Sequence, residues 1–461
     1  MAETPSLDHW KKEVLGRIDR DEIVRIGSDL INIPSPTGFE AECADYIIGR
    51  YKQHGIKHIP QEFDEGRRNA IGVIAGDGTG PTLMFNGHMD TSYIGNEQYL
   101  PDKPGYKPHA IVEDGWLYGL GIYNMKGGIA SFLHAAEVVK ASGVPLKGDI
   151  LLACVGGEIE KSQIGERQGK LYRGGGCGTW YAITHGAVAD FAVVGEPTGL
   201  SVLQAHGGYV WTQITLVGNP RHTVFGEKRN NTINNMMKLA NHLQEWGDDF
   251  ERRHTYMGMS SKVTLSAIEG GWPHRCSRVP VFCTLYVDTR LMPGQSPLLV
   301  RREMEEAVAR LSKSDPDFRS LHLDMNIFMN QWGSQCSPEE RIHKEMIEAH
   351  QEVMGSPPDI TAVSFASDAG ELNAHGIPAL NYGPTGKTRQ LSDGRHYGNA
   401  QSDWNPDAGE HASIDDMVQG AKAYATLMLN VCTKTREELG IQRRERTSDV
   451  QGHGGHGHRH G

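Results

Sequence analysis

Three clusters of side chains that commonly bind metals each follow a short apolar run. His88 and Asp90 lie in "NGHMD", Glu158 and Glu160 in "GGEIE", and Glu196 in "VVGEP". The carboxyl ends of parallel strands meet at one edge of a sheet, which is where α/β proteins bind ligands. Residues two apart on a strand point the same way, as His88 and Asp90 would. One imidazole and several carboxylates at such an edge suit Zn or Mn with an open coordination position.

Each cluster has an ordinary alternative when it is taken alone. A His-x-Asp sequence is a weak signal, and Glu196, directly before a proline, could be a carboxylate that caps a loop. Burial of Glu158 and Glu160 at a strand end would be costly, which favours a functional role for them. A carboxylate beside an imidazole, as with Asp90 and His88, usually fixes the tautomer and orientation of a metal-binding histidine. The combination therefore predicts the metal site more strongly than any one motif.

The elements that would position these side chains alternate between apolar runs and amphipathic stretches. Strand-like runs cover 69–76, 81–90, 148–158 and 190–199, and 127–143 is helix-like. This alternation predicts an α/β catalytic domain with a mostly parallel sheet flanked by helices.

The pattern changes after residue 206. Alternating strands and two helices follow in the order β-α-β-β-α, which predicts an inserted two-layer α+β domain over 207–318. The catalytic domain would then comprise 1–206 and 319–450. Residues 451–461 form a His- and Gly-rich tail, which we expect to be disordered, although its histidines could hold metal loosely.

Composition excludes several kinds of partner. A chain of 461 residues exceeds what one core usually serves, in line with two domains. The net charge of -11 argues against nucleic acid as a partner. Seven scattered cysteines without a CxxC pair indicate a reducing compartment. We find neither a signal peptide nor a run near the ~18 apolar residues of a membrane span, so we predict a cytoplasmic protein with no membrane partner.

Seven motifs in order resemble one enzyme superfamily, that of acetylornithine deacetylase, succinyl-diaminopimelate desuccinylase and aminoacylase. They are "NGHMDT", "LYGLGIYNMKGGIA", "GGEIE", "DFAVVGEPTG", "GNPRHT", "VDTRLMPG" and "NYGPTG", and the similarity covers roughly residues 20–430. Members are metal-dependent exopeptidases and N-acyl amino acid amidohydrolases. The resemblance implies that the inserted domain is a dimerisation (lid) domain and that the protein is a homodimer.

The resemblance also implies roles for the metal-site residues. His88 and Glu196 match the ligands of one metal, and Asp90 matches the carboxylate that orients the histidine. Glu158 matches the general base that activates the attacking water.

Three further positions match the substrate side of the family's active site. His222 matches the histidine that reaches the partner subunit's site and polarises the scissile carbonyl, although by itself it would be read as a surface residue. Arg290 and Gly383 match substrate-binding positions. Arg290 could clamp a substrate carboxylate, but a structural salt bridge with Asp288 is an equal alternative. The expected substrate is a small molecule with a carboxylate.

Three family positions differ in this chain. The bridging Asp is Asn124, and the Glu ligand directly after the base is Ile159. The C-terminal His ligand has no clear counterpart, and His396 and His411 are the nearest imidazoles. Glu160, the next residue, is the candidate to replace Ile159 as a ligand.

These differences predict a site with one metal ion. Two divalent cations ~3.5 Å apart repel by roughly 19 kcal/mol at an effective dielectric near 20. The neutral amide of Asn124 offsets far less of that repulsion than a carboxylate. We therefore expect one Zn or Mn ion bound by His88 and Glu196, with Asn124 as a weak ligand or hydrogen-bond partner and Glu160 as a further candidate ligand.

The predicted function is hydrolysis of an amide C–N bond in an N-acyl amino acid or related small carboxylate. A metal-activated water would attack, and Glu158 would act as general base. One alternative is an aminohydrolase that releases ammonia from an aromatic amino acid such as a nitroanthranilate. A second is a catalytically silent binding protein on the same fold.

Overall fold

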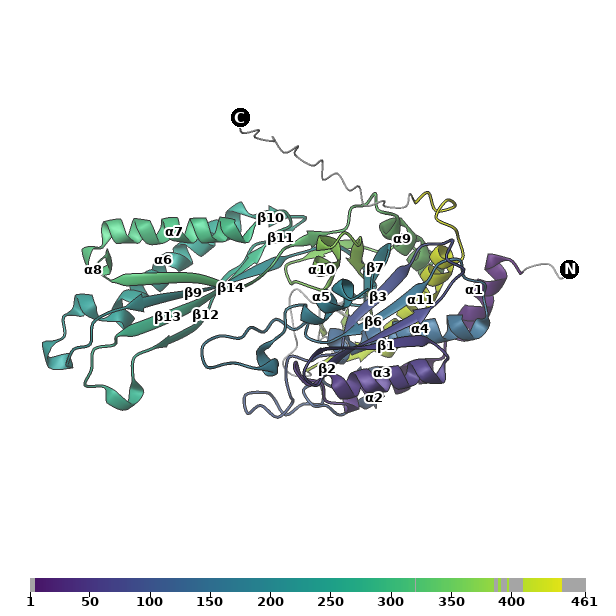
Figure 1. The fold of residues 1–461 in the computed structure, drawn as a ribbon, viewed down its shortest axis with the longest axis horizontal. Helices are drawn as coiled ribbons and strands as arrows, with labels where there is room; N and C mark the ends of the chain where they lie inside the picture. Colours follow the sequence, from purple (N-terminus) through teal and green to yellow (C-terminus); the bar gives the residue numbers. More distant parts are fainter. Residues whose placement is uncertain (1–4, 320, 385–388, 391–395, 398–408, 442–461) are drawn as a thin grey trace, which may run out of the picture.

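The computed structural model describes residues 5–319, 321–384, 389–390, 396–397 and 409–441. It consists of an α/β part and an elongated α+β part that projects from one side of it (Figure 1). The His- and Gly-rich tail predicted for 451–461 lies outside the described residues.

A nine-stranded sheet forms the centre of the α/β part, in the order β1-β2-β6-β3-β7-β17-β8-β15, with β16 paired to β8. Its strands β6, β3, β7 and β17 lie parallel to one another, whereas β1, β2 and β15 pair antiparallel. The mostly parallel sheet predicted from the sequence is thus confirmed. The strands are β1 Lys57–Asp64, β2 Arg67–Ile74, β3 Leu83–His88, β6 Ile150–Val155, β7 Phe191–Val194, β8 Val202–His206, β15 Ser334–Gln335, β16 Ile360–Val363 and β17 Ala379–Asn381.

Helices cover both faces of this sheet, which explains why its central strands are apolar throughout. Leu83 and Phe85 of β3 face one core, which contains residues of α1, α2, α3, α4, α9 and α11. Met84 faces the other core, together with α5 and α10. The helices are α1 Leu7–Gly16, α2 Arg20–Asn32, α3 Ala41–Gln53, α4 Gly127–Ser142, α5 Cys177–Thr184, α9 Arg341–Met354, α10 Ala369–Ala374 and α11 Ile414–Cys432.

The inserted part is a two-layer α+β unit. An antiparallel sheet in the order β12-β13-β9-β14 packs through alternate residues against α6 and α7. Its elements are β9 Gly208–Val217, α6 Thr232–Arg253, β12 Val263–Gly270, β13 Phe282–Leu291, α7 Pro297–Ser314, α8 Pro316–Arg319 and β14 His322–Gln331. Because β14 pairs with β9 along its length, this layer extends past the boundary at 318 that the sequence suggested.

Short elements complete the described chain. A three-stranded sheet joins β4 Ile111–Glu113, β5 Trp116–Tyr118 and β20 His411–Ser413, and two hairpins pair β10 Thr255–Tyr256 with β11 Met259–Ser260 and β18 Arg389–Gln390 with β19 His396–Tyr397. All seven cysteines lie in the described part, and each is free. In the same part of the chain, no helix has the length and apolarity needed to cross a bilayer.

Candidate active site

Three adjacent parallel strands, β6, β3 and β7, bring the predicted residues to one edge of the sheet. His88 is the last residue of β3 and lies level with Val155, the last of β6, so Glu158 follows just beyond that edge. Asn86 of β3 lies level with the end of β7, which places Glu196 two residues beyond. All three side chains are buried: His88 is 0 % exposed, Glu158 8 % and Glu196 3 %.

Oxygen atoms surround one nitrogen of His88. Its Nε2 lies 3.1 Å from Asn124 Oδ1, 3.6 Å from Glu158 Oε2 and 3.9 Å from Glu196 Oε1. Its Nδ1 donates to the main-chain carbonyl of Asp90 at 3.0 Å, so Nε2 is the nitrogen that faces these oxygens. A tetrahedral ion with bonds of about 2.1 Å keeps its ligand atoms about 3.4 Å apart. The three oxygens therefore lie about as far from Nε2 as the ligand atoms of a divalent ion lie from one another.

The charges of this site favour a cation at its centre. Burial opposes protonation of His88, but Glu158, Asp90 and Glu196 outweigh it and hold the pKa of His88 well above its usual value. Burial raises the pKa of the Glu158 carboxyl well above its usual range, and His88 only partly offsets this. The pKa of Glu196 is raised by burial as well. These buried carboxylates gain stability from any positive charge placed among them.

Asp90 acts on Glu158 more directly than on His88. Its carboxylate accepts the N–H groups of Glu158 at 3.1 Å and Ile159 at 3.3 Å and the hydroxyl of Thr37 at 2.9 Å. The same carboxylate lies 3.6 Å from His88 Nδ1, whose hydrogen bond goes to the Asp90 carbonyl instead. Asp90 thus links the end of β3 to the loop that carries Glu158.

Asn124 lies in the irregular turn Ile122–Lys126, which precedes α4. Glu410 holds this turn, because its Oε2 accepts the N–H groups of Tyr123 and Asn124, each at 3.2 Å. Burial raises the pKa of Glu410 to about 7. The sequence does not reveal Glu410, because its partners Tyr123 and Asn124 are more than 280 residues away.

Two glycines allow the segments of the site to approach closely. A Cβ at Gly128, in the first turn of α4, would lie 2.0 Å from the carbonyl oxygen of Gly195, next to Glu196. A Cβ at Gly383 would lie 2.4 Å from the carbonyl oxygen of Glu196. Gly383, predicted on the substrate side, therefore lies against the main chain of a candidate ligand, where larger residues do not fit.

Asp368 is a second buried carboxylate that the sequence did not reveal. It is 1 % exposed, accepts the hydroxyl of Thr179 on Oδ2 at 2.7 Å, and has no partner for Oδ1 among the residues described. Burial raises its pKa to about 7, and its charge contributes to the raised pKa of Glu158. In the sequence it precedes a short helix and therefore resembles an ordinary helix cap.

Glu160 does not join the candidate ligands. Both of its oxygens accept from the guanidinium of Arg290, each at 2.7 Å, and the Nε of Arg290 donates to Asp288 at 2.9 Å. Ile159 is buried and leaves its position in the site without a donor. The suggestion that Glu160 replaces Ile159 as a ligand is therefore not supported by the geometry.

The remaining histidines lie elsewhere. His411 is buried, stacks on Tyr118 with ring centroids 5.6 Å apart, and lies edge-on to Trp116. His222 is exposed on the inserted part, where it accepts the N–H of Val224 at 3.3 Å. The side chain of His396 and residues 398–408, where a C-terminal ligand was expected, lie outside the described residues.

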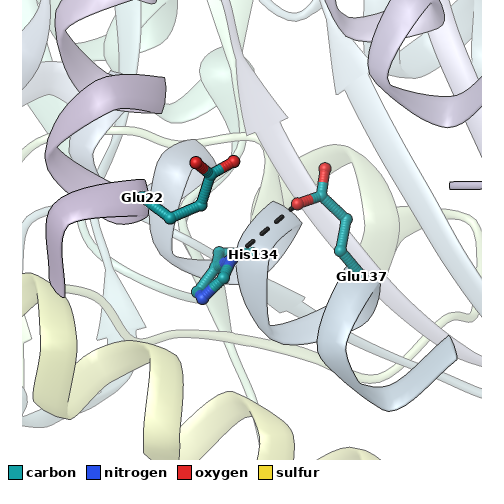
Figure 2. Close-up of side chains that lie close together, drawn as sticks. All are labelled: Glu22, His134 and Glu137. Atoms are coloured by element: carbon teal, nitrogen blue, oxygen red, sulfur yellow. Dashed lines mark ion pairs between the residues drawn. The ribbon is translucent and has the colours of Figure 1, made fainter. Parts of the chain in front are cut away.

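A different cluster also has the composition of a metal site. Glu22, His134 and Glu137 place ligand atoms within 4.8 Å of one another, the one such group of His, Cys, Asp or Glu found in the described chain (Figure 2). Arg50, however, donates to both oxygens of Glu137 at 2.8 and 2.6 Å and to Glu22 at 2.7 Å. Since Arg50 pairs with both carboxylates and Arg25 pairs with Glu22 as well, this cluster is an ion-pair network between α2, α3 and α4.

Comparison with known proteins assigns the chain to a family. The sequence profile described as peptidase family M20/M25/M40 matches residues 84–430. The chain belongs to this family. Its members hydrolyse carbon–nitrogen bonds, and the resemblance seen in the motifs is confirmed.

Individual relatives cover almost the whole chain. It is 25% identical over 451 residues to N-formyl-4-amino-5-aminomethyl-2-methylpyrimidine deformylase of Bacillus subtilis, covering 91% of this chain and 96% of that protein. It is 25% identical over 379 residues to succinyl-diaminopimelate desuccinylase 2 of Ruegeria sp., covering 80% and 89%. The YXEP protein of Bacillus subtilis, a dinuclear metal-binding peptidase of the M20 family, shares the fold with a TM-score of 0.58 at 13% identity, covering 90% and 99%.

Proposed function

We propose that this M20 family hydrolase cleaves amide bonds with one divalent ion, Zn or Mn, in each active site. His88 and Glu196 are the ligands, and Asn124 is a weaker third ligand. The observation that carries the proposal is the ring of oxygens at 3.1–3.9 Å around His88 Nε2, two of them from carboxylates. When bound, such an ion polarises a carbonyl and lowers the pKa of a coordinated water.

Glu158 moves the proton in the proposed reaction. Its carboxylate takes the proton of the attacking water and delivers it to the leaving nitrogen. Burial favours the protonated form of this carboxyl, so it can hold the proton between the two transfers. The hydrogen bonds from the Glu158 and Ile159 N–H groups to Asp90 fix the position of this base.

Two features support one ion rather than two. The position after the base is Ile159, and the residue between the two metal positions is the neutral Asn124. The carboxylate of Glu160, the nearest substitute, is held by Arg290.

We further infer that the enzyme acts as a homodimer through its inserted part. His222 is exposed there beside Val224 and Phe225, which are 78% and 73% exposed in the single chain. In a dimer, this histidine would polarise the scissile carbonyl in the partner's site.

A substrate panel tests the proposal. Protein lacking residues 452–461 is loaded with Zn or Mn and incubated with N-formyl, N-acetyl and N-succinyl amines, the acyl groups suggested by the relatives. We expect release of the free amine that a chelator abolishes. Ammonia release from nitroanthranilate alone, or no turnover of any amide, would contradict the proposal.

A further inference from the structure

All three nitrogens of the Arg290 guanidinium donate a hydrogen bond to a carboxylate. Nη1 and Nη2 donate to the two oxygens of Glu160, each at 2.7 Å, and Nε donates to Asp288 at 2.9 Å. Glu160 belongs to the loop that follows the proposed base, and Arg290 to β13 of the inserted part. The three side chains carry one positive and two negative charges, so their sum is negative.

Neighbouring groups hold this arrangement in place. The indole N–H of Trp211 donates to Asp288 at 3.2 Å, and the ring of Tyr209 lies 5.5 Å from the guanidinium carbon. Side chains of Glu160, Asp288 and Arg290 are only about one-fifth exposed. A substrate carboxylate could take the Nη1–Nη2 edge of Arg290 only by displacing Glu160 from a bidentate, charge-assisted pair. It would also approach a group whose net charge repels it.

We propose that the physiological substrate is an acylated amine without a carboxylate on its amine half. The amine half is neutral or positively charged where it faces Glu160, Arg290 and Asp288. This inference rests on the proposed amidohydrolase function and replaces the expectation of a substrate carboxylate bound by Arg290.

Lys161 is the competing cation in the same loop. It follows Glu160 directly and is partly exposed. A carboxylate-bearing substrate held by Lys161 would produce the opposite preference, so the test includes this residue.

Two probes of the same shape separate the possibilities. N-formylphenylglycine and its primary carboxamide differ only in the charge of one group. We expect the metal-loaded enzyme to have a kcat/KM for the carboxamide at least about tenfold higher, because a like charge facing a carboxylate pair costs a factor of ten or more. Glu160→Gln makes the charge of the group neutral and should reduce this ratio by about tenfold. The matched control Glu305→Gln, in an exposed pair with Arg301 on α7, should leave the ratio unchanged.

A wild-type preference for the carboxylate probe would overturn the inference, above all if Lys161→Met removed that preference. Equal ratios in Glu160→Gln and Glu305→Gln would overturn it as well. If Glu160→Gln does not fold, calorimetry on the wild type decides: phenylglycinamide should bind more tightly than phenylglycine, and the reverse order would refute the inference. If both probes are hydrolysed but the carboxylate probe is preferred, only this inference is refuted. If no amide is hydrolysed at all, the proposed function is refuted.

Discussion

Replacing Glu158 with Gln removes the proposed base while keeping its size and shape. The side chain is 8 % exposed and its Oε2 lies 3.6 Å from His88 Nε2, so an amide fits the same space. The main-chain hydrogen bond from residue 158 to Asp90 is unaffected by the change. General base catalysis contributes about 10²–10⁴ in rate, or roughly 3–5 kcal/mol in the barrier, and kcat should fall by that factor.

The assay for Glu158→Gln combines turnover with metal analysis. Amine release from the best substrate of the panel gives kcat, and mass spectrometry of the dialysed protein gives ions per chain. We expect a loss of turnover with an unchanged metal content. Glu339→Gln, at an exposed position paired with Lys344, is the control and should match the wild type in both measurements. Turnover near that of the wild type would refute the role of Glu158, and loss of the ion together with activity would make Glu158 a ligand instead.

Three further predictions follow from the groups around the site. Asp90→Asn should weaken metal affinity by roughly 10–100-fold in a competition titration with a chelator, because it removes the negative charge that lies 3.6 Å from Nδ1 of the ligand His88; unchanged affinity would argue against this role of Asp90. Glu410→Ala removes the carboxylate that accepts from the partly buried N–H groups of Tyr123 and Asn124, and urea unfolding should show a loss of about 1–3 kcal/mol for each. Burial raises the pKa of Asp368 from 3.8 to about 7. In the metal-free protein, protonated Asp368 therefore contributes fully to the free energy of unfolding below about pH 4, and this contribution is lost as pH rises through 7. The full change is of the order of 4 kcal/mol, and Asp368→Asn should flatten the pH dependence of the unfolding free energy; an equal slope in both proteins would exclude Asp368 as its source.

Simple strand rules predicted the centre of the candidate site. His88, Glu158 and Glu196 each follow an apolar run, and the carboxyl ends of neighbouring parallel strands must meet. The structure brings the three side chains together around one imidazole nitrogen. Their catalytic and metal-binding roles remain predictions.

The rest of the site depends on contacts that local patterns do not contain. Glu410 and Asn124 are 286 residues apart in sequence. Glu410 reaches the turn of Asn124 because β20, which directly follows Glu410, pairs with β5. Asp368 looks like a helix cap until Thr179 and the sheet edge are placed beside it. The sequence is compatible with Arg290 as a substrate clamp or as a partner of Asp288. Its pairing with Glu160 joins the inserted part to the α/β part, and sequence patterns do not show how these two parts face each other.

The boundary of the inserted part shows the same limit. The alternation in β14 is as clear as in the strands before it, but only its pairing with β9 assigns it to the smaller sheet. A strand at the junction of two domains suits either sheet by pattern alone.

The number of divalent ions per chain tests the central claim most directly. Protein without residues 452–461, so that tail histidines do not contribute, is saturated with Zn or Mn, dialysed and analysed for metal. A site built on His88, Glu196 and the neutral Asn124 predicts one tightly held ion per chain. Two tightly held ions per chain would contradict it.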